Sequence, residues 1–252
     1  GIHVVSSTQH PTEVQDLIAA LLNINAATVT VEIRRMGGAF GGKESQAAHF
    51  AMLAALGAHL TGLPVKLRLD RDDDMLITGK RHDFLVNYKV GHDADGLIMA
   101  ADIELSARCG WSSDLSRSVN DRALFHAENA YFIPSIRITS NRYKTHTVSN
   151  TAFRGFGGPQ GMMGIERCMD VIAKVTGRDP LDVRLLNLYG VSGRETPYGM
   201  SVDEHALPEL IQRLADTSDY RSRRKEIDLE NGQSSRFRRG IALTPVKFGI
   251  SF

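Results

Sequence analysis

The sequence of 252 residues has few of the features that mark membrane, disulfide-stabilised or metal-cluster proteins. Its two cysteines, Cys109 and Cys168, lie far apart and form no CxxC pair, so neither a disulfide framework nor a zinc or iron–sulfur site is indicated. We interpret both as reduced packing residues. No apolar run approaches the roughly 20 residues that cross a bilayer, and the N-terminal residues lack a secretory pattern, which favours a cytoplasmic location.

Neither sign of charge is in excess, because 30 Lys and Arg face 29 Asp and Glu, for a net charge of +1. Such a chain has no sequence-wide field to attract nucleic acid or an anionic membrane. The basic stretch Ser222–Lys225 is interrupted by nearby acidic residues, which is typical of a solvated helix face. With 42% hydrophobic residues the chain can form one large or two medium packed domains.

Hydrophobic periodicity predicts a mixture of helices and strands. Helices are expected at residues 8–22, 44–60, about 159–175, 181–188, 206–214 and 220–229. Strands are expected at residues 28–34, 65–69, 84–90 and 97–105, and within 131–143, with a turn at residues 92–96 joining two of them as a hairpin. These elements predict an α+β fold of mixed sheets packed with helices, neither all-helical nor doubly wound.

The chain is expected to divide near residue 190. Residues 190–199 are rich in loop-forming Gly and Pro, so we expect a first subdomain at 1–190 and, at 191–252, a linker with the start of an incomplete second subdomain. Residues 246–252 alternate like an unfinished strand and no initiator Met is present. We therefore interpret the chain as an internal fragment that is truncated at its C-terminus.

Two glycine clusters, at residues 37–42 and 155–158, each follow an extended stretch and precede a helix. Glycine lets a backbone approach a ligand closely, and a helix that begins behind it offers unpaired N–H groups to an anion. Neither cluster has the form of a dinucleotide or nucleotide phosphate loop, so a nicotinamide or ATP site is poorly supported. An isolated Gly-Gly pair would indicate only a tight turn. Here each cluster holds a Phe (Phe40, Phe156) beside a charged residue (Glu44, Arg154), which favours a flat-ringed ligand.

The two clusters and their flanks carry a family resemblance. The stretches Arg35–Glu44 (RMGGAFGGKE) and Asn150–Gln160 (NTAFRGFGGPQ) closely resemble the two molybdopterin-contacting segments of the xanthine dehydrogenase and aldehyde oxidase family. Shorter stretches at residues 7–11, 74–79, 121–126 and 247–252 match in the same order and at similar separations. The resemblance covers essentially the whole chain and is closest to the xanthine dehydrogenases.

The resemblance implies a molybdenum–molybdopterin cofactor, with molybdenum held through the pterin and not by side chains of this chain. Gln9 would face an oxygen on the metal. The backbone N–H groups of Phe40, Gly41 and Arg154 would bind oxygens of the cofactor, a role that suits glycine-rich backbone. From the residues alone, Gln9 would be only a neighbour of a helix start.

The resemblance also implies a substrate pocket formed by Glu44, Arg122, Phe156 and Phe252. Glu44 and Arg122 would be catalytic, and the two phenylalanines would lie face-on and edge-on to the substrate ring. Attack on a ring carbon places negative charge on the ring, which an arginine can stabilise, and a carboxyl group can hydrogen-bond a ring nitrogen. Without the resemblance, Arg122 would be assigned to a surface ion pair with Asp121, and Glu44 to the first turn of a helix.

The polar pair favours a purine substrate. Aldehyde oxidases of this family commonly have apolar residues at the positions of Glu44 and Arg122, so the resemblance implies hydroxylation of hypoxanthine and xanthine to urate, with hydride transfer to molybdenum. An aldehyde-oxidising relative, other N-heterocycles and a non-catalytic assembly module of the same fold are the alternatives. Glu128 and Glu166 stand in helix-like contexts and are assigned structural roles.

The resemblance implies that part of the machinery lies elsewhere. The general base, a glutamate, and a GQG-type cofactor segment are expected beyond residue 252. Iron–sulfur (2Fe-2S) and FAD domains would be on other segments or subunits of an oligomeric enzyme. We therefore expect the isolated fragment to be inactive.

Overall fold

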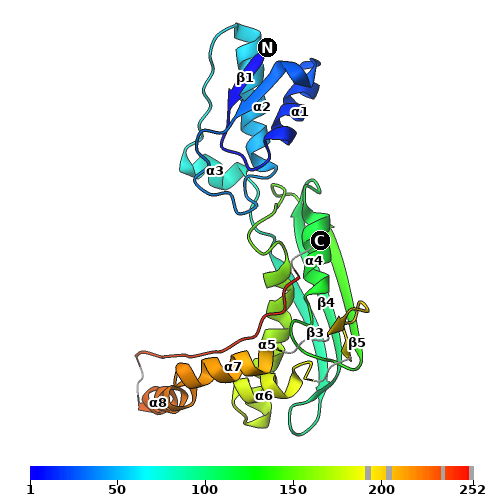
Figure 1. Ribbon diagram of the computed structural model, residues 1–252, viewed down its shortest axis with the longest axis vertical. Coiled ribbons are helices and arrows are strands. Elements are labelled where there is room, and N and C mark those ends of the chain that lie inside the picture. Colours follow the sequence, from blue (N-terminus) through cyan, green and yellow to red (C-terminus); the bar gives the residue numbers. More distant parts are fainter. Residues whose placement is uncertain (191–193, 203–205, 234–235, 250–252) are drawn as a thin grey trace. The chain divides into compact units, whose positions relative to one another are not determined.

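The computed structural model of the chain describes residues 1–190, 194–202, 206–233 and 236–249 (Figure 1). In chain order its elements are β1 (Ile2–Val5), α1 (Pro11–Leu22), the 3-10 helix η1 (Ala26–Thr28), β2 (Val29–Glu32), α2 (Gln46–Thr61), α3 (Arg71–Ile77), β3 (Phe84–His92), β4 (Ile98–Gly110), α4 (Ser116–Phe125), β5 (Ile136–Lys144), α5 (Gly158–Thr176), α6 (Pro180–Asn187), β6 (Arg194–Glu195), β7 (Ser201–Val202), α7 (Ala206–Thr217) and α8 (Tyr220–Gln233). Helices and small separate sheets coexist, which confirms the predicted α+β class. None of the described helices is long and apolar enough to cross a membrane.

The chain forms two compact units, each assembled from separated segments. Unit 1 comprises residues 1–85, 106–121 and 140–157, and unit 2 comprises residues 86–105, 122–139 and 158–252. This division differs from the single boundary near residue 190 that the sequence favours, and that boundary stays a prediction.

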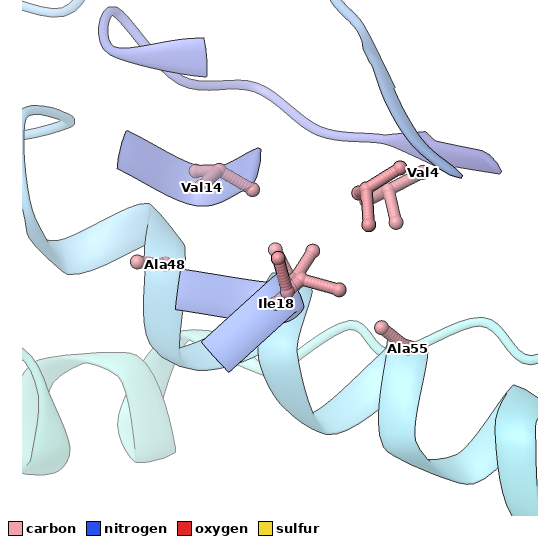
Figure 2. Close-up of a cluster of buried hydrophobic side chains, with 8 residues drawn as sticks. Val4, Val14, Ile18, Ala48 and Ala55 are labelled. Atoms are coloured by element: carbon pink, nitrogen blue, oxygen red, sulfur yellow. The ribbon is translucent and has the colours of Figure 1, made fainter. Parts of the chain in front are cut away.

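Unit 1 has a small core between a two-stranded parallel sheet and two helices. β1 pairs with β2 in the register Ile2 to Val29 through Val5 to Glu32. Figure 2 shows Val4 of β1, Val14 and Ile18 of α1, and Ala48 and Ala55 of α2 facing a common interior. Val14 and Ile18 are one helical turn apart and fully buried, so they form the inner face of α1. The alanines of α2 let that helix approach closely.

Local capping explains where the helices of unit 1 begin and end. Pro11 stands in the first turn of α1, where its missing N–H costs no hydrogen bond, and Asn23 ends the helix in the left-handed conformation. Asp70 caps α3, since its carboxylate accepts a hydrogen bond from the Asp73 N–H at 2.9 Å. The sequence prediction missed α3, although Asp70 and the acidic first turn behind it were a usable signal.

The second sheet has the strand order β3-β4-β5, and its hairpin was predicted. In the turn between β3 and β4, the Asp93 carboxylate accepts hydrogen bonds from the N–H groups of Asp95 and Leu97, each at 2.9 Å. Gly96 has φ of +89°, and a Cβ there would lie 3.1 Å from Ile172. The turn therefore requires glycine both for its backbone conformation and for its packing in unit 2.

Unit 2 also contains a buried polar network that confirms the structural assignment of Glu166. The Glu166 carboxylate accepts hydrogen bonds from the hydroxyl of Tyr131, the amide of Asn129 and the guanidinium of Arg184. Arg184 is buried and also contacts Asp170. Because each charge is paired, the network can be accommodated beside the apolar face of α5.

Both cysteines are free and buried, as predicted. Burial raises the pKa of the Cys168 thiol to about 12, so this sulfur is held in its unreactive thiol form. The two cysteines therefore act as packing residues.

Two expected strands are absent from the described residues. Residues 65–69 are in extended coil without a paired strand, and the described part of 246–252, residues 246–249, is also not a strand. In the second case side chains replace a strand partner, because the Lys247 N–H donates to the Asn129 amide oxygen at 3.0 Å and the Gly249 N–H donates to the His126 ring at 3.2 Å. Alternation of apolar residues therefore predicted extension correctly but not pairing.

Candidate functional site

The first glycine loop lies between β2 and α2 in unit 1 and consists of consecutive tight turns. Gly37, Gly38, Phe40 and Gly41 all have positive φ, between 53° and 93°. The Gly42 N–H donates to the Ala39 carbonyl at 2.9 Å, and the Glu44 N–H donates to the Gly41 carbonyl at 3.1 Å. The turns leave Phe40 61% exposed, so its aromatic ring can contact a ligand.

The second glycine loop precedes α5 and repeats the same kind of geometry. Gly155, Phe156 and Gly157 have φ of 91°, 50° and 100°. The Phe156 N–H donates to the Phe153 carbonyl at 2.7 Å, which closes a turn around Arg154. A left-handed Phe is unusual, and each loop has one at its centre.

The two loops contact each other within unit 1. A Cβ at Gly41 would lie 3.1 Å from the carbonyl carbon and Cβ of Ala152 and 3.2 Å from the Phe153 nitrogen, so only glycine allows this approach. The Arg154 guanidinium lies over the Phe40 ring, 5.6 Å from its centroid. Both loops were predicted to bind the cofactor, and in the structure they contact each other.

Gln9, just before α1, is fixed against the first loop. Its side-chain oxygen accepts a hydrogen bond from the Gly41 N–H at 3.0 Å, and its own N–H donates to the Lys43 carbonyl at 3.0 Å. Buried Thr8 supports the same connection by donating to the Lys43 carbonyl at 3.1 Å. With its oxygen engaged, Gln9 presents its amide NH₂ group as a donor.

The Gly41 N–H was expected to bind a cofactor oxygen, but the structure gives it a different partner. The Gly41 N–H is engaged by Gln9, so in this structure it orients that side chain instead of pointing an unpaired donor at a ligand. Among the described residues, the N–H groups of Phe40 and Arg154 have no protein acceptor. The Gln9 amide and these two N–H groups form a set of donors that suits an anionic or oxo-bearing cofactor.

Glu44 follows directly behind the first loop and is half-buried. Burial raises the pKa of its carboxyl group, and the negative charges of Glu13 and Asp114 add to the increase, while His10 opposes it. This carboxyl group therefore keeps its proton to a higher pH than an exposed glutamate does.

Two further residues around the loops were missed by the sequence analysis. Arg81 donates to the Arg154 carbonyl at 2.7 Å and lies over the Phe153 ring, 4.7 Å from its centroid. Asp114 has φ of +39°, and one of its carboxylate oxygens is buried without a hydrogen-bond partner. Arg81 follows the matched stretch 74–79, which was a weak signal, whereas nothing in the sequence around Asp114 indicated a role.

Arg122 lies on α4 and belongs to unit 2. It is buried, its guanidinium donates to the Gly249 carbonyl at 3.0 Å, and it lies over the Phe248 ring, 5.0 Å from the centroid. Burial lowers its pKa. Since Glu44 belongs to unit 1, the expected pairing of Arg122 with Glu44 stays a prediction, and Phe252 lies outside the described residues.

The C-terminal segment that contacts Arg122 is held by unit 2. The Asn129 amide donates to the Pro245 carbonyl at 2.9 Å, and Lys247 pairs with buried Glu128. The Phe248 ring packs where Gly158 lacks a side chain, since a Cβ there would lie 2.4 Å from it. Glu128 therefore has the structural role that the sequence indicated.

The fold and the loops define an α+β domain that offers backbone and amide donors to an anionic, flat-ringed cofactor. A family model described as the molybdopterin cofactor-binding domain matches residues 1–188. The chain belongs to this molybdopterin cofactor-binding domain family.

The relatives include larger oxidoreductases. The chain is 45% identical to a xanthine dehydrogenase of Drosophila subobscura over 251 residues, covering 100% of this chain and 19% of that protein. It is 41% identical to the nicotinate hydroxylase hnxS of Emericella nidulans over 253 residues, with the same coverage. The solved aldehyde oxidoreductase of Desulfovibrio gigas superposes with a TM-score of 0.79 at 28% identity, covering 90% of this chain and 25% of that one. The chain thus spans about a fifth of the length of these curated relatives.

Proposed function

We propose that the full-length protein containing this chain hydroxylates hypoxanthine and xanthine to urate, with this chain supplying the substrate pocket and part of the cofactor site. The observation that carries the proposal is the position of Glu44, a half-buried carboxyl group that follows the first glycine loop directly and can hydrogen-bond a ligand. An aldehyde substrate would not need this group, whereas a purine ring can bond to it.

The residues of unit 1 fit a molybdenum–pterin cofactor. The Gln9 amide and the N–H groups of Phe40 and Arg154 would hold oxygens of the cofactor, and Gly41 would orient Gln9. The cofactor, when bound, supplies the oxygen and accepts the electrons of the oxidation. The protein contributes binding, orientation and electrostatics.

The substrate side chains would act on the purine ring. Glu44 would accept a hydrogen bond from a ring N–H and so fix the orientation of the ring, while the Arg122 guanidinium would stabilise negative charge that develops during attack. Phe156 and Phe252 would hold the plane of the ring between them. Arg122 is suited to this role because its burial makes a charge interaction stronger than it would be in water.

We expect the isolated 252-residue chain to be inactive toward xanthine and to retain little molybdenum. The general base is expected on a segment beyond residue 252, and the iron–sulfur and FAD groups on other domains or subunits, so the cofactor would be only partly enclosed. Urate formation and metal content of purified chain are the measurements. Turnover by this material would contradict the proposal.

A second candidate is hydroxylation of another N-heterocycle, which the 41% identity to a nicotinate hydroxylase favours. The two are separated by kcat/KM for xanthine and nicotinate on the complete protein, with benzaldehyde included to test for an aldehyde oxidase. A complete protein that lacks molybdenum and all three activities would instead be an assembly module.

The pH dependence of purine oxidation tests the role of Glu44 directly. Because the pKa of Glu44 is raised, its carboxylate takes up a proton at a higher pH than an ordinary glutamate does. The protonated group is a weaker hydrogen-bond acceptor for the substrate. We expect kcat/KM of the complete enzyme to fall as pH falls through this value. Glu44→Gln removes the titrating group, so its kcat/KM should not show this decrease at low pH. Identical profiles for both proteins would exclude Glu44 from substrate recognition.

A further inference from the structure

Unit 1 contains a large groove, and its lining includes Gly42 and Lys43 at the end of the first glycine loop. The groove has a volume of about 920 Å³, and its walls are β1 on one side and residues 64–67 on the other. Its floor is a face of α2 that includes Phe50, Ala54 and Ala58. In Figure 1 the long segment that leads from α2 to α3 runs beside β1.

The β1 wall is the open edge of a sheet. β1 uses one edge to pair with β2, and among the residues that the structure describes no strand pairs with its other edge. An open edge exposes a row of backbone donors and acceptors, which proteins normally cover or pair. The core of unit 1 lies beneath β1, since Val4 is buried against α2.

The opposite wall has the sequence of a strand but no strand partner. Residues 65–69 alternate apolar and basic side chains, and Val65 packs against α2, where a Cβ at Gly57 would lie 3.4 Å from it. Val65 and Leu67 are nevertheless 42% and 40% exposed. Residues 65–69, which were predicted to be a strand, and the open edge of β1 therefore face the same groove. A strand inserted between them would give each of the two a pairing partner.

We propose that a β-strand from the part of the same polypeptide outside these 252 residues fills this groove, pairing with β1 and with residues 64–69. About four fifths of the length of the relatives lies outside the matched region, so ample chain exists to supply the strand. A second copy is a poorer occupant, because its own strand-like segments at this site, β1 and 64–69, are needed as the walls of its own groove.

The lining predicts the chemistry of the inserted strand. Side chains that face Phe50 and the alanines of α2 should be apolar. Outward side chains should be polar, because the lining also contains Lys43, Lys66 and Asp74, whereas the lining residues His3 and Arg34 are already paired with Glu32. Main-chain hydrogen bonds to both walls would supply the pairing. This inference depends on family membership and not on the identity of the substrate.

The test places a photoreactive diazirine analogue of leucine at position 67 of the full-length protein. Position 63 is the matched control, because Leu63 is 65% exposed and lies outside the groove lining. We expect irradiation to link position 67, but not position 63, to a segment outside the 252 residues. A mixture of ¹⁴N- and ¹⁵N-labelled protein should show that each link forms within one molecule.

Hydrogen exchange of the unaltered full-length protein gives a second measurement. We expect alternate amides of residues 65–68, those that would donate to the inserted strand, to exchange on the order of 100-fold more slowly than the amides between them. Links from position 67 that stay within the 252 residues, join two copies or reach another protein would overturn the proposal. The absence of protection at every amide of residues 65–68 would overturn it as well.

Discussion

Replacement of Glu44 by Val and Arg122 by Met in the full-length protein is expected to lower kcat for xanthine by roughly 10²-fold or more. Arg122 would act on charge that develops in the transition state, so its loss appears in kcat, while Glu44 would orient the ring. A small aldehyde uses neither group. The kcat/KM for the aldehyde should therefore hold steady or rise. The ratio of kcat/KM for xanthine to kcat/KM for the aldehyde should approach inversion.

The measurement is kcat/KM for xanthine and for benzaldehyde, with molybdenum content matched to that of the unaltered protein. Glu226→Val with Arg223→Met is the control, since it makes the same chemical changes at exposed positions of α8. The control should leave both activities unchanged. If the Glu44 and Arg122 variant instead loses both activities in parallel, these residues support the cofactor or the fold and do not recognise the substrate.

Substitution of Gly41 by Ala is expected to remove most of the molybdenum from the full-length protein. The added Cβ would lie within 3.2 Å of Ala152 and the Phe153 backbone, at φ of +87°. Either the two loops separate or the Gly41 N–H loses Gln9, and both changes disrupt the set of donors. A tenfold loss of cofactor occupancy would require only about 1.4 kcal/mol.

Gly37→Ala provides the matched control for this glycine. Gly37 lies in the same loop with φ of +66°, but a Cβ there meets nothing within 4 Å. Both variants therefore place an alanine in the unfavourable left-handed conformation, and only Gly41→Ala adds a steric clash with the other loop. Metal analysis should show near-normal molybdenum for Gly37→Ala. Equal retention in both variants would mean that the contact between loops does not hold the cofactor.

Local sequence signals predicted those parts of the fold that depend on neighbouring residues. Pro11 placed the start of α1, and the Asp93–Gly96 turn identified the β3–β4 hairpin, because caps and turns are decided over a few positions. Pairing of residues 65–69 could not be read in the same way, since it depends on a strand that alternation alone does not reveal. The division into discontinuous units was equally hidden, as it depends on contacts between distant segments.

The parts of the candidate site that consist of sequence motifs, the two glycine loops, could be predicted from the sequence. The glycine clusters identified the loops. The family resemblance assigned Gln9 to the same site, although it lies 32 positions before Gly41 in the sequence. Their mutual contact through Gly41 and Ala152, and the support from Arg81, required the folded chain because no local pattern records a distance between loops. Nor could the sequence show that the Gly41 N–H would be engaged by Gln9.

The interleaved course of the chain constrains how this domain can change in evolution. The chain passes from one unit to the other after residues 85, 105, 121, 139 and 157. A single recombination point in the gene therefore cannot exchange one unit while preserving the other. Glu44 and Arg122, although they belong to different units, should be inherited together, and new substrate preferences in such a lineage should arise by point substitution instead of by domain shuffling.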